Sequence, residues 1–223
     1  GGYSNIVLNS ALNTSEISHA DRALASALFY GVLDRRITID WLLSKHIKTP
    51  LKKVAPYTLT VLRCAVYQIA FMEKIPESAA VNEAVKLIKA SGERRNAAFV
   101  NAVLRNIIRT GTDLPYGNDV RTLSVRYSCP EWIVKSFIND YGEENAVELL
   151  SQSLKTPPVT VRVNTVRTTP ERLIKILEEN NVKAAGTETE NALTISITGD
   201  ITALLPYKEG LFHIQDTASQ TAA

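Results

Sequence analysis

The stretch GERRNAAFVNAVLRNIIR, residues 92–109, decides how this chain folds, because it predicts a helix with two opposite walls. At 3.6 residues per turn one wall collects six apolar side chains, those of Ala97, Val100, Val103, Leu104, Ile107 and Ile108. The other wall carries Arg94, Asn101, Arg105 and Arg109, with the three arginines inside an arc of roughly 60°. Such a helix packs its apolar wall into a bundle and leaves its basic wall in solvent.

The basic wall has two interpretations: it is a solvated charged face, or it is a surface that binds a polyanion. Arginine suits the second because its planar fork stays charged and pairs with phosphate through two hydrogen bonds. No carboxylate follows Glu93 within the helix, so the arginines lack the i,i+4 partners that a merely soluble face usually carries. The pattern therefore favours nucleic acid.

Five amphipathic or apolar segments precede this helix, beginning near Tyr3, Ser18, Ile37, Pro56 and Pro76. Ser18 and the acid three residues later predict an N-cap. Gly31 costs helix propensity, which predicts a close crossing with another helix. The segment after Pro56 is apolar on much of its surface and should be the central helix. Together these segments predict an all-α bundle.

The sequence pattern of the second half of the chain changes twice, first at a breaker-rich stretch and then from helical to strand periodicity. A breaker-rich stretch, residues 110–118, precedes helices expected at about Val120–Tyr127, Glu131–Tyr141 and Glu143–Leu154. After Pro158 the period becomes two, and strand, helix, strand, strand, helical turn and strand follow, at 159–163, 170–180, 182–185, 193–197, 201–205 and 211–214. This order predicts a small ferredoxin-like or RNA-recognition-like α/β sandwich. Its strands carry hardly an aromatic, so the stacking surface of an RNA-recognition sheet is missing.

The bulk composition restricts function only weakly. A net charge of +2 does not itself indicate nucleic acid, since only the local clustering of arginines does. Two distant cysteines and three scattered histidines offer no metal-ligand spacing. No apolar run is long enough to span a membrane, and with no signal peptide and free thiols we expect a cytoplasmic protein.

Several short sequence motifs resemble those of one protein family. DRAL at 21–24, LRCAVYQ at 62–68, IPESAAVNEAV at 75–85 and FVNAVLR at 99–105 resemble the NusB-like domain. The branch is the one that begins bacterial ribosomal RNA cytosine-5 methyltransferases of the RsmB (Sun) type. PEW at 130–132, VRVN at 161–164 and FHIQDTAS at 212–219 fit the same family, so the resemblance covers essentially the whole chain.

The resemblance implies four regions. These are a NusB-like RNA-binding domain at 1–111, a helical connector at 112–155, an RRM-like α/β module at 156–216 and, at 217–223, the start of a methyltransferase domain that the chain lacks. It further implies a SAM-dependent enzyme that methylates C5 of a cytosine in 16S rRNA. We expect a monomer. We expect the chain alone to be inactive and to hold neither S-adenosylmethionine nor a metal, because none of its glycines forms a Gly-rich turn after a strand.

C5 methylation of cytosine uses a cysteine thiolate. Cys129 precedes a predicted helix, where a thiolate would be stabilised, but nothing resembling the catalytic loops of the family surrounds it. We therefore do not interpret Cys129 as the catalytic nucleophile. We assign Cys64, in the most apolar helix, to core packing. No catalytic residue is expected here.

The candidate RNA-binding residues are Arg35, Arg36, Arg94, Arg95, Arg105, Arg109, Arg162 and Asn164. For each arginine of the helical domain the alternative is surface solvation. For Arg162 and Asn164, which alternate with buried valines on one strand, the resemblance implies a face towards substrate or the missing catalytic domain. The alternative is an intramolecular polar bridge. The alternative function is a non-catalytic NusB-like RNA-binding or antitermination factor that regulates transcription, which would lack the α/β module.

Overall fold

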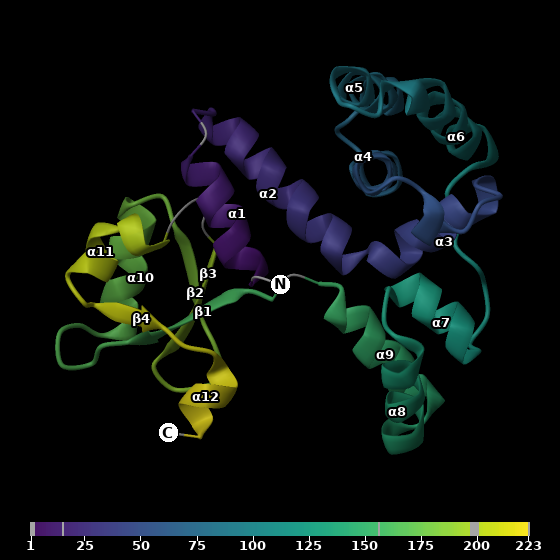
Figure 1. The fold of residues 1–223 in the computed structure, drawn as a ribbon. Coiled ribbons are helices and arrows are strands. Elements are labelled where there is room, and N and C mark those ends of the chain that lie inside the picture. Colours follow the sequence, from purple (N-terminus) through teal and green to yellow (C-terminus); the bar gives the residue numbers. More distant parts are fainter. Residues whose placement is uncertain (1–2, 15, 156, 197–200, 223) are drawn as a thin grey trace. The chain divides into compact units, whose positions relative to one another are not determined.

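The computed structural model describes residues 3–14, 16–155, 157–196 and 201–222, and the chain divides into two compact units, Gly1–Leu154 and Lys155–Ala223 (Figure 1). The helices of the first unit are α1 (Ser4–Asn13), α2 (His19–Asp34), α3 (Arg36–His46), α4 (Pro56–Phe71), α5 (Glu77–Ala90), α6 (Ala97–Thr110), α7 (Val120–Tyr127), α8 (Glu131–Tyr141) and α9 (Glu143–Ser153), with 3-10 turns η1 (Leu51–Lys53) and η2 (Arg94–Asn96).

Helix α4 is the centre of the bundle formed by α2 to α6. It packs against α2, α3, α5 and α6, which surround it in Figure 1. Its buried residues are Thr58, Val61, Leu62, Ala65 and Val66, and they meet the buried faces of α3, α5 and α6. Because α4 buries side chains towards several neighbours, it carries the apolar surface that the sequence predicted for a central helix.

The crossing of α2 over α4 explains Gly31. A Cβ atom at Gly31 would overlap the ring and hydroxyl of Tyr67 on α4. Gly31 therefore leaves room for the Tyr67 ring where α2 packs on α4, and the predicted crossing at Gly31 is confirmed. The predicted cap of α2 is confirmed as well, since Ser18 Oγ accepts a hydrogen bond from the Asp21 amide at 3.1 Å.

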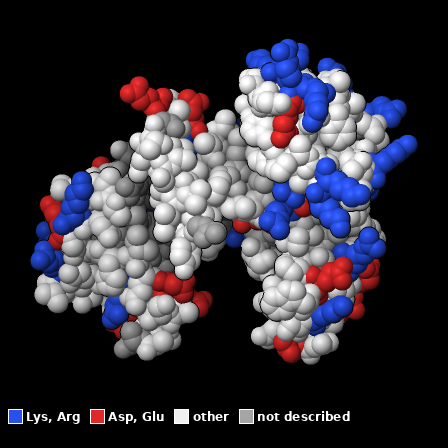
Figure 2. Space-filling model, viewed as in Figure 1, with Lys and Arg blue, Asp and Glu red and all other residues white. Residues whose placement is uncertain are grey.

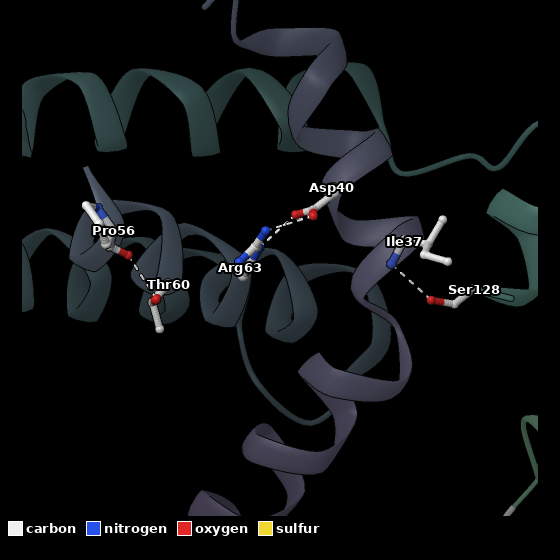
Figure 3. A network of polar contacts seen from close by, with 6 residues as sticks. All are labelled: Ile37, Asp40, Pro56, Thr60, Arg63 and Ser128. Carbon is white, nitrogen blue, oxygen red and sulfur yellow. Dashed lines mark hydrogen bonds and ion pairs between the residues drawn. The ribbon is translucent and has the colours of Figure 1, made fainter. Parts of the chain in front are cut away.

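Helices α7, α8 and α9 pack on one another around Leu123, Val134 and Leu150, and α7 also packs on α3. Two hydrogen bonds join α3 to α7 and its C-cap. Thr38 Oγ1 donates to the Val125 carbonyl at 2.5 Å. The Ile37 amide donates to Oγ of the C-cap residue Ser128 at 3.1 Å, as Figure 3 shows. The residues expected to form a connector therefore belong to the first compact unit.

The second unit is a four-stranded antiparallel sheet with helical elements. Along the chain these are β1 (Val159–Val163), α10 (Pro170–Glu179), β2 (Lys183–Gly186), β3 (Ala192–Ser196), η3 (Ile201–Ala203), α11 (Leu205–Lys208), β4 (Phe212–Ile214) and α12 (Thr217–Thr221). The strand order is β2-β3-β1-β4, with Val161 opposite both Leu193 and Ile214. Buried residues of β1, α10, β3 and β4 form its core: Val161, Val163, Leu173, Leu177, Leu193, Ile195 and Phe212.

The predicted fold class is confirmed, with a helical bundle followed by a small α/β domain. One or both boundaries shift by one residue at α1, α9, α10, β2, β3 and β4, and Ile197, predicted as the last residue of β3, lies outside the described residues. The turn predicted at 201–205 is two elements, η3 and α11, because Pro206 fits only the first turn of a new helix. None of the described helices combines the length and the apolarity that a membrane crossing needs.

Candidate nucleic-acid interface

Helix α6 has the two walls that its sequence predicts. Val100, Val103, Leu104 and Ile107 are buried, and Ala97 and Ile108 pack at the edge of the same core. Arg105 and Arg109 are exposed on the other wall. In the view of Figure 2, lysine and arginine side chains predominate over the α4–α6 part of the helical domain, whereas acidic and basic side chains mix over α7–α9.

Two neutral amides hold these arginines in place. Arg105 Nε donates to Asn101 Oδ1 at 3.0 Å, and Arg109 Nη2 donates to Asn106 Oδ1 at 2.7 Å. Among the described residues no carboxylate forms an ion pair with either guanidinium. The amides restrict the side chains without neutralising them, and they leave most of the five N–H donors of each guanidinium free for a ligand.

His46 extends this network from α3. The Asn106 amide nitrogen lies 2.9 Å from His46 Nδ1, and Thr110 Oγ1 lies 3.4 Å from His46 Nε2. Burial lowers the pKa of His46, and the positive charges of Lys45 and Arg109 lower it further. These effects favour the neutral ring, and in the tautomer with the proton on Nε2 the Nδ1 atom accepts the hydrogen bond from the Asn106 amide.

A pocket of about 250 Å³ lies beside the two arginines. Its walls come from the first turns of α5 and the last turns of α6: Glu77, Ser78, Val81, Arg105, Ile108 and Arg109. The sequence did not predict this pocket, because nothing in the spacing of residues 77–81 and 105–109 shows that the start of one helix lies against the end of the next.

The prediction that Arg94 shares a helical face with Arg105 and Arg109 is wrong. Residues 94–96 form the 3-10 turn η2, and α6 begins at Ala97. Glu93 fixes this turn, since its carboxylate accepts hydrogen bonds from the amide, at 2.9 Å, and the hydroxyl of Thr58 in the first turn of α4. A 3-10 turn advances about 120° per residue, whereas an α-helix advances about 100°. The α-helical rotation that placed Arg94 beside Arg105 and Arg109 therefore does not apply to residues 94–96. Arg94 and Arg95 are both exposed.

The two arginines between α2 and α3 differ. The Arg35 guanidinium lies 5.0 Å from the centre of the Phe71 ring, and its backbone both ends α2 and begins α3. Arg35 thus has a packing role on α4. Arg36 is exposed, and among the described residues no side-chain hydrogen bond or ion pair involves it.

Arg162 and Asn164 lie in the second compact unit. The Asn164 amide nitrogen donates to the Gly210 carbonyl at 2.8 Å, and its Oδ1 accepts from the Val166 amide at 3.2 Å. Asn164 therefore links the turn after β1 to the residues before β4. For Asn164 this is the intramolecular polar bridge that was the alternative to a contact with substrate. Arg162 is half-buried opposite His213 on the strand β4, and no described residue accepts a hydrogen bond from its guanidinium.

Both cysteines are free thiols of intermediate exposure. Cys129 packs with the α7–α9 core, and burial raises the pKa of its thiol. Burial also raises the pKa of the Cys64 thiol on α4. Because a thiolate is the reactive species, both residues are poorly suited to attack a base at neutral pH.

The described residues do not suit S-adenosylmethionine or a metal. The sheet is antiparallel, and β1 is followed by Asn164, Thr165 and Val166 rather than by a Gly-rich turn opening a helix. Within the described ranges no cluster of three His, Cys, Asp or Glu residues could hold a metal ion.

Two family models match the chain. The NusB family matches residues 1–109, and the ferredoxin-like domain of the RsmF/B-like methyltransferases matches residues 129–202. The second match begins before α8, so it includes the last helices of the first compact unit as well as most of the second.

Relatives match along nearly the whole chain. A probable ribosomal RNA small subunit methyltransferase B of Bacillus subtilis (strain 168) is 34% identical over 99% of the chain and 50% of its own length. The ribosomal RNA small subunit methyltransferase B of Shewanella oneidensis is 30% identical over 92% of the chain and 47% of its own length. The chain thus spans about half the length of these relatives.

The crystal structure of PH0851 shows the same fold. It superposes with a TM-score of 0.69 over 96% of this chain and 49% of its own, at 19% sequence identity.

Proposed function

Because the chain joins a NusB-family domain to the ferredoxin-like domain of the RsmF/B-like methyltransferases and aligns with half of the methyltransferase B proteins, we propose that it is the RNA-recognition region of a SAM-dependent 16S rRNA (cytosine-C5)-methyltransferase. Methyl transfer and the cofactor are assigned to the part of these relatives that the chain does not match. The chain's own task is to bind and position ribosomal RNA.

The observation that carries this proposal is the pair of arginines on α6. Arg105 and Arg109 are exposed, are positioned by Asn101 and Asn106, and form no ion pair with a described carboxylate. Held but uncompensated guanidiniums bind phosphate at a lower entropic cost than freely moving ones. Arg36, Arg94 and Arg95, which are also exposed, are secondary contacts in this proposal.

In this proposal the residues of this chain position the RNA and do not take part in the methyl transfer. Phosphate contacts set the register and orientation of a protein on nucleic acid but carry little sequence information. We therefore assign the choice of the target cytosine to the catalytic part and the anchoring of the surrounding RNA to α6. Cys129, with its raised pKa, takes no part in the reaction.

A second candidate is a non-catalytic NusB-like RNA-binding factor, and the match of residues 1–109 to the NusB family supports it. The α/β domain with its own family match favours the methyltransferase, because a free-standing NusB-type factor has no use for that domain.

The test is a charge reversal of both arginines. Arg105→Glu/Arg109→Glu should reduce affinity for a 16S rRNA fragment about tenfold or more at low salt, and should flatten the dependence of affinity on salt. The control is Arg121→Glu/Lys135→Glu, which makes the same change of charge at exposed positions of α7 and α8. Equal affinities of the two double variants would contradict the assignment of the interface to α6.

Melting temperature distinguishes loss of contact from loss of fold. Both arginines point away from the apolar wall, so the double variant should melt within a few degrees of the parent. With RNA and S-adenosylmethionine, the chain alone should bind RNA and produce no methylated cytosine.

A further inference from the structure

The pocket between α5 and α6 is larger and less polar than a phosphate alone requires. Its volume of about 250 Å³ is far above the roughly 10–15 Å³ that one water molecule needs. Val81, which is 2% exposed, and the half-buried Ile108 provide an apolar floor. An apolar floor of this size suits a flat ring that has left a base stack.

The polar groups of the pocket are distributed unequally. Arg105 and Arg109 line the α6 side, while Glu77 and Ser78 line the α5 side. Among the described residues Glu77 forms no ion pair with either arginine. The pocket therefore offers a cationic side and an acceptor side with apolar surface between them, which complements a ligand with an anion at one end and hydrogen-bond donors at the other.

We propose that this pocket binds one unpaired nucleotide of the RNA, with the phosphate on Arg105 and Arg109 and the base over Val81 and Ile108. The inference rests on the proposed function, since it specifies what the arginines of α6 hold. A paired nucleotide does not fit, because its base is stacked and its edge is occupied. The helical domain accordingly recognises single-stranded RNA.

The Glu77 carboxylate gives the pocket a preference among bases. Facing the base edge, it accepts hydrogen bonds from an exocyclic amino group such as N4 of cytosine. Uracil has a carbonyl oxygen at the corresponding position, which a carboxylate repels. Cytosine should therefore bind better than uracil, although the two rings have nearly the same size.

The experiment measures the affinity of the 223-residue chain for three labelled RNAs by fluorescence anisotropy: oligo(C), oligo(U) and a mixed-sequence duplex of the same length. The main variant, Ser78→Leu, fills the pocket from an exposed position of α5. Its control, Ala90→Leu, adds a leucine to the exposed far end of the same helix. Glu77→Gln tests the base edge.

The wild-type chain should bind oligo(C) more tightly than oligo(U) and the duplex. Ser78→Leu should weaken oligo(C) binding about five- to tenfold, comparable to the loss of one base contact, and should leave the duplex within about twofold. Ala90→Leu should match the wild type, and Glu77→Gln should reduce the difference between oligo(C) and oligo(U).

The result that would overturn the inference is unchanged oligo(C) affinity in Ser78→Leu, or a wild-type preference for the duplex. Both are distinguishable from failure of the proposed function. If Arg105→Glu/Arg109→Glu weakens all three RNAs while Ser78→Leu weakens none, the arginines bind RNA but the pocket is not used. If the arginine variant weakens none, the RNA-binding function itself fails.

Discussion

Arg63 on α4 and Asp40 on α3 form a two-pronged ion pair, with Nε 2.7 Å from Oδ1 and Nη2 2.8 Å from Oδ2 (Figure 3). Both side chains are about three-quarters buried, at 23% and 29% exposure. The pair links two helices of the bundle core and occupies a guanidinium that would otherwise resemble the arginines of α6, which we propose as RNA contacts. Arg63 is thus a structural arginine, because a carboxylate from another helix lies beside it.

Removing one partner of this pair should destabilise the bundle. Asp40→Asn should lower the free energy of unfolding by about 1–2 kcal/mol, because it leaves a largely buried guanidinium with a weaker partner. Urea denaturation provides the measurement. The control is Glu83→Gln, which breaks the exposed Glu83–Lys86 pair, 2.6 Å long, and should change stability by less than about 0.5 kcal/mol. A larger loss in the control than in Asp40→Asn would contradict the structural role of Arg63.

Gly31→Ala should destabilise the chain although alanine is the better helix former. Helix propensity alone favours alanine by about 1 kcal/mol, whereas overlap of the new Cβ with Tyr67 should cost about 1–3 kcal/mol or more. Thermal unfolding should therefore show a lower melting temperature. Gly92→Ala has no atom within 4 Å of the new Cβ and is the control.

Shortening Tyr67 should rescue the Gly31→Ala variant. In Gly31→Ala/Tyr67→Leu the atoms that overlap are absent, so the two substitutions should be less destabilising together than their sum. Strict additivity in the double-mutant cycle would show that the two residues do not meet.

Stability should fall as the pH drops below about 6.5, partly because of His46. The pKa of His46 is lowered in the folded chain, mainly by burial, so below the ordinary histidine pKa the unfolded chain binds the proton more readily. Folding stability is complete above that value and decreases as the pH falls towards the folded pKa. His46→Asn, which can still accept from Asn106 at the Nδ1 position, should show a smaller decrease between pH 7.5 and pH 5.5 in urea titrations. Identical pH profiles would exclude this contribution.

Both cysteines should react slowly with alkylating reagents. Because burial raises the thiol pKa of Cys64 and Cys129, the thiolate fraction at neutral pH is below that of an unstructured peptide. Rates of iodoacetamide labelling, measured by mass spectrometry from pH 7 to pH 9.5, should lie below those of a model peptide at each pH. Cys129→Ser should bind RNA as the wild type does. Fast labelling of Cys129 would contradict the conclusion that its thiol is unreactive.

Local signals of the sequence predicted most of the secondary structure. The cap at Ser18, the prolines at the starts of α4 and α10 and the alternation of valines in β1 identify elements without any knowledge of their neighbours. The two walls of α6 followed from helical periodicity in the same way. The helix was extended too far towards Arg94 because its start depends on a contact between Glu93 and Thr58, which lie 35 residues apart.

The sequence by itself determined the type and order of most elements and the lack of a carboxylate within α6 beside Arg105 and Arg109, because periodicity, capping and charge spacing are properties of neighbouring residues. The tertiary structure alone decided that Arg63 is paired, that Arg35 lies over Phe71, that Asn164 fastens a turn, and that Ser78 and Glu77 share a pocket with Arg105 and Arg109. Each of these relationships joins residues far apart in the chain, and only packing of the elements brings such residues within a few ångströms of each other.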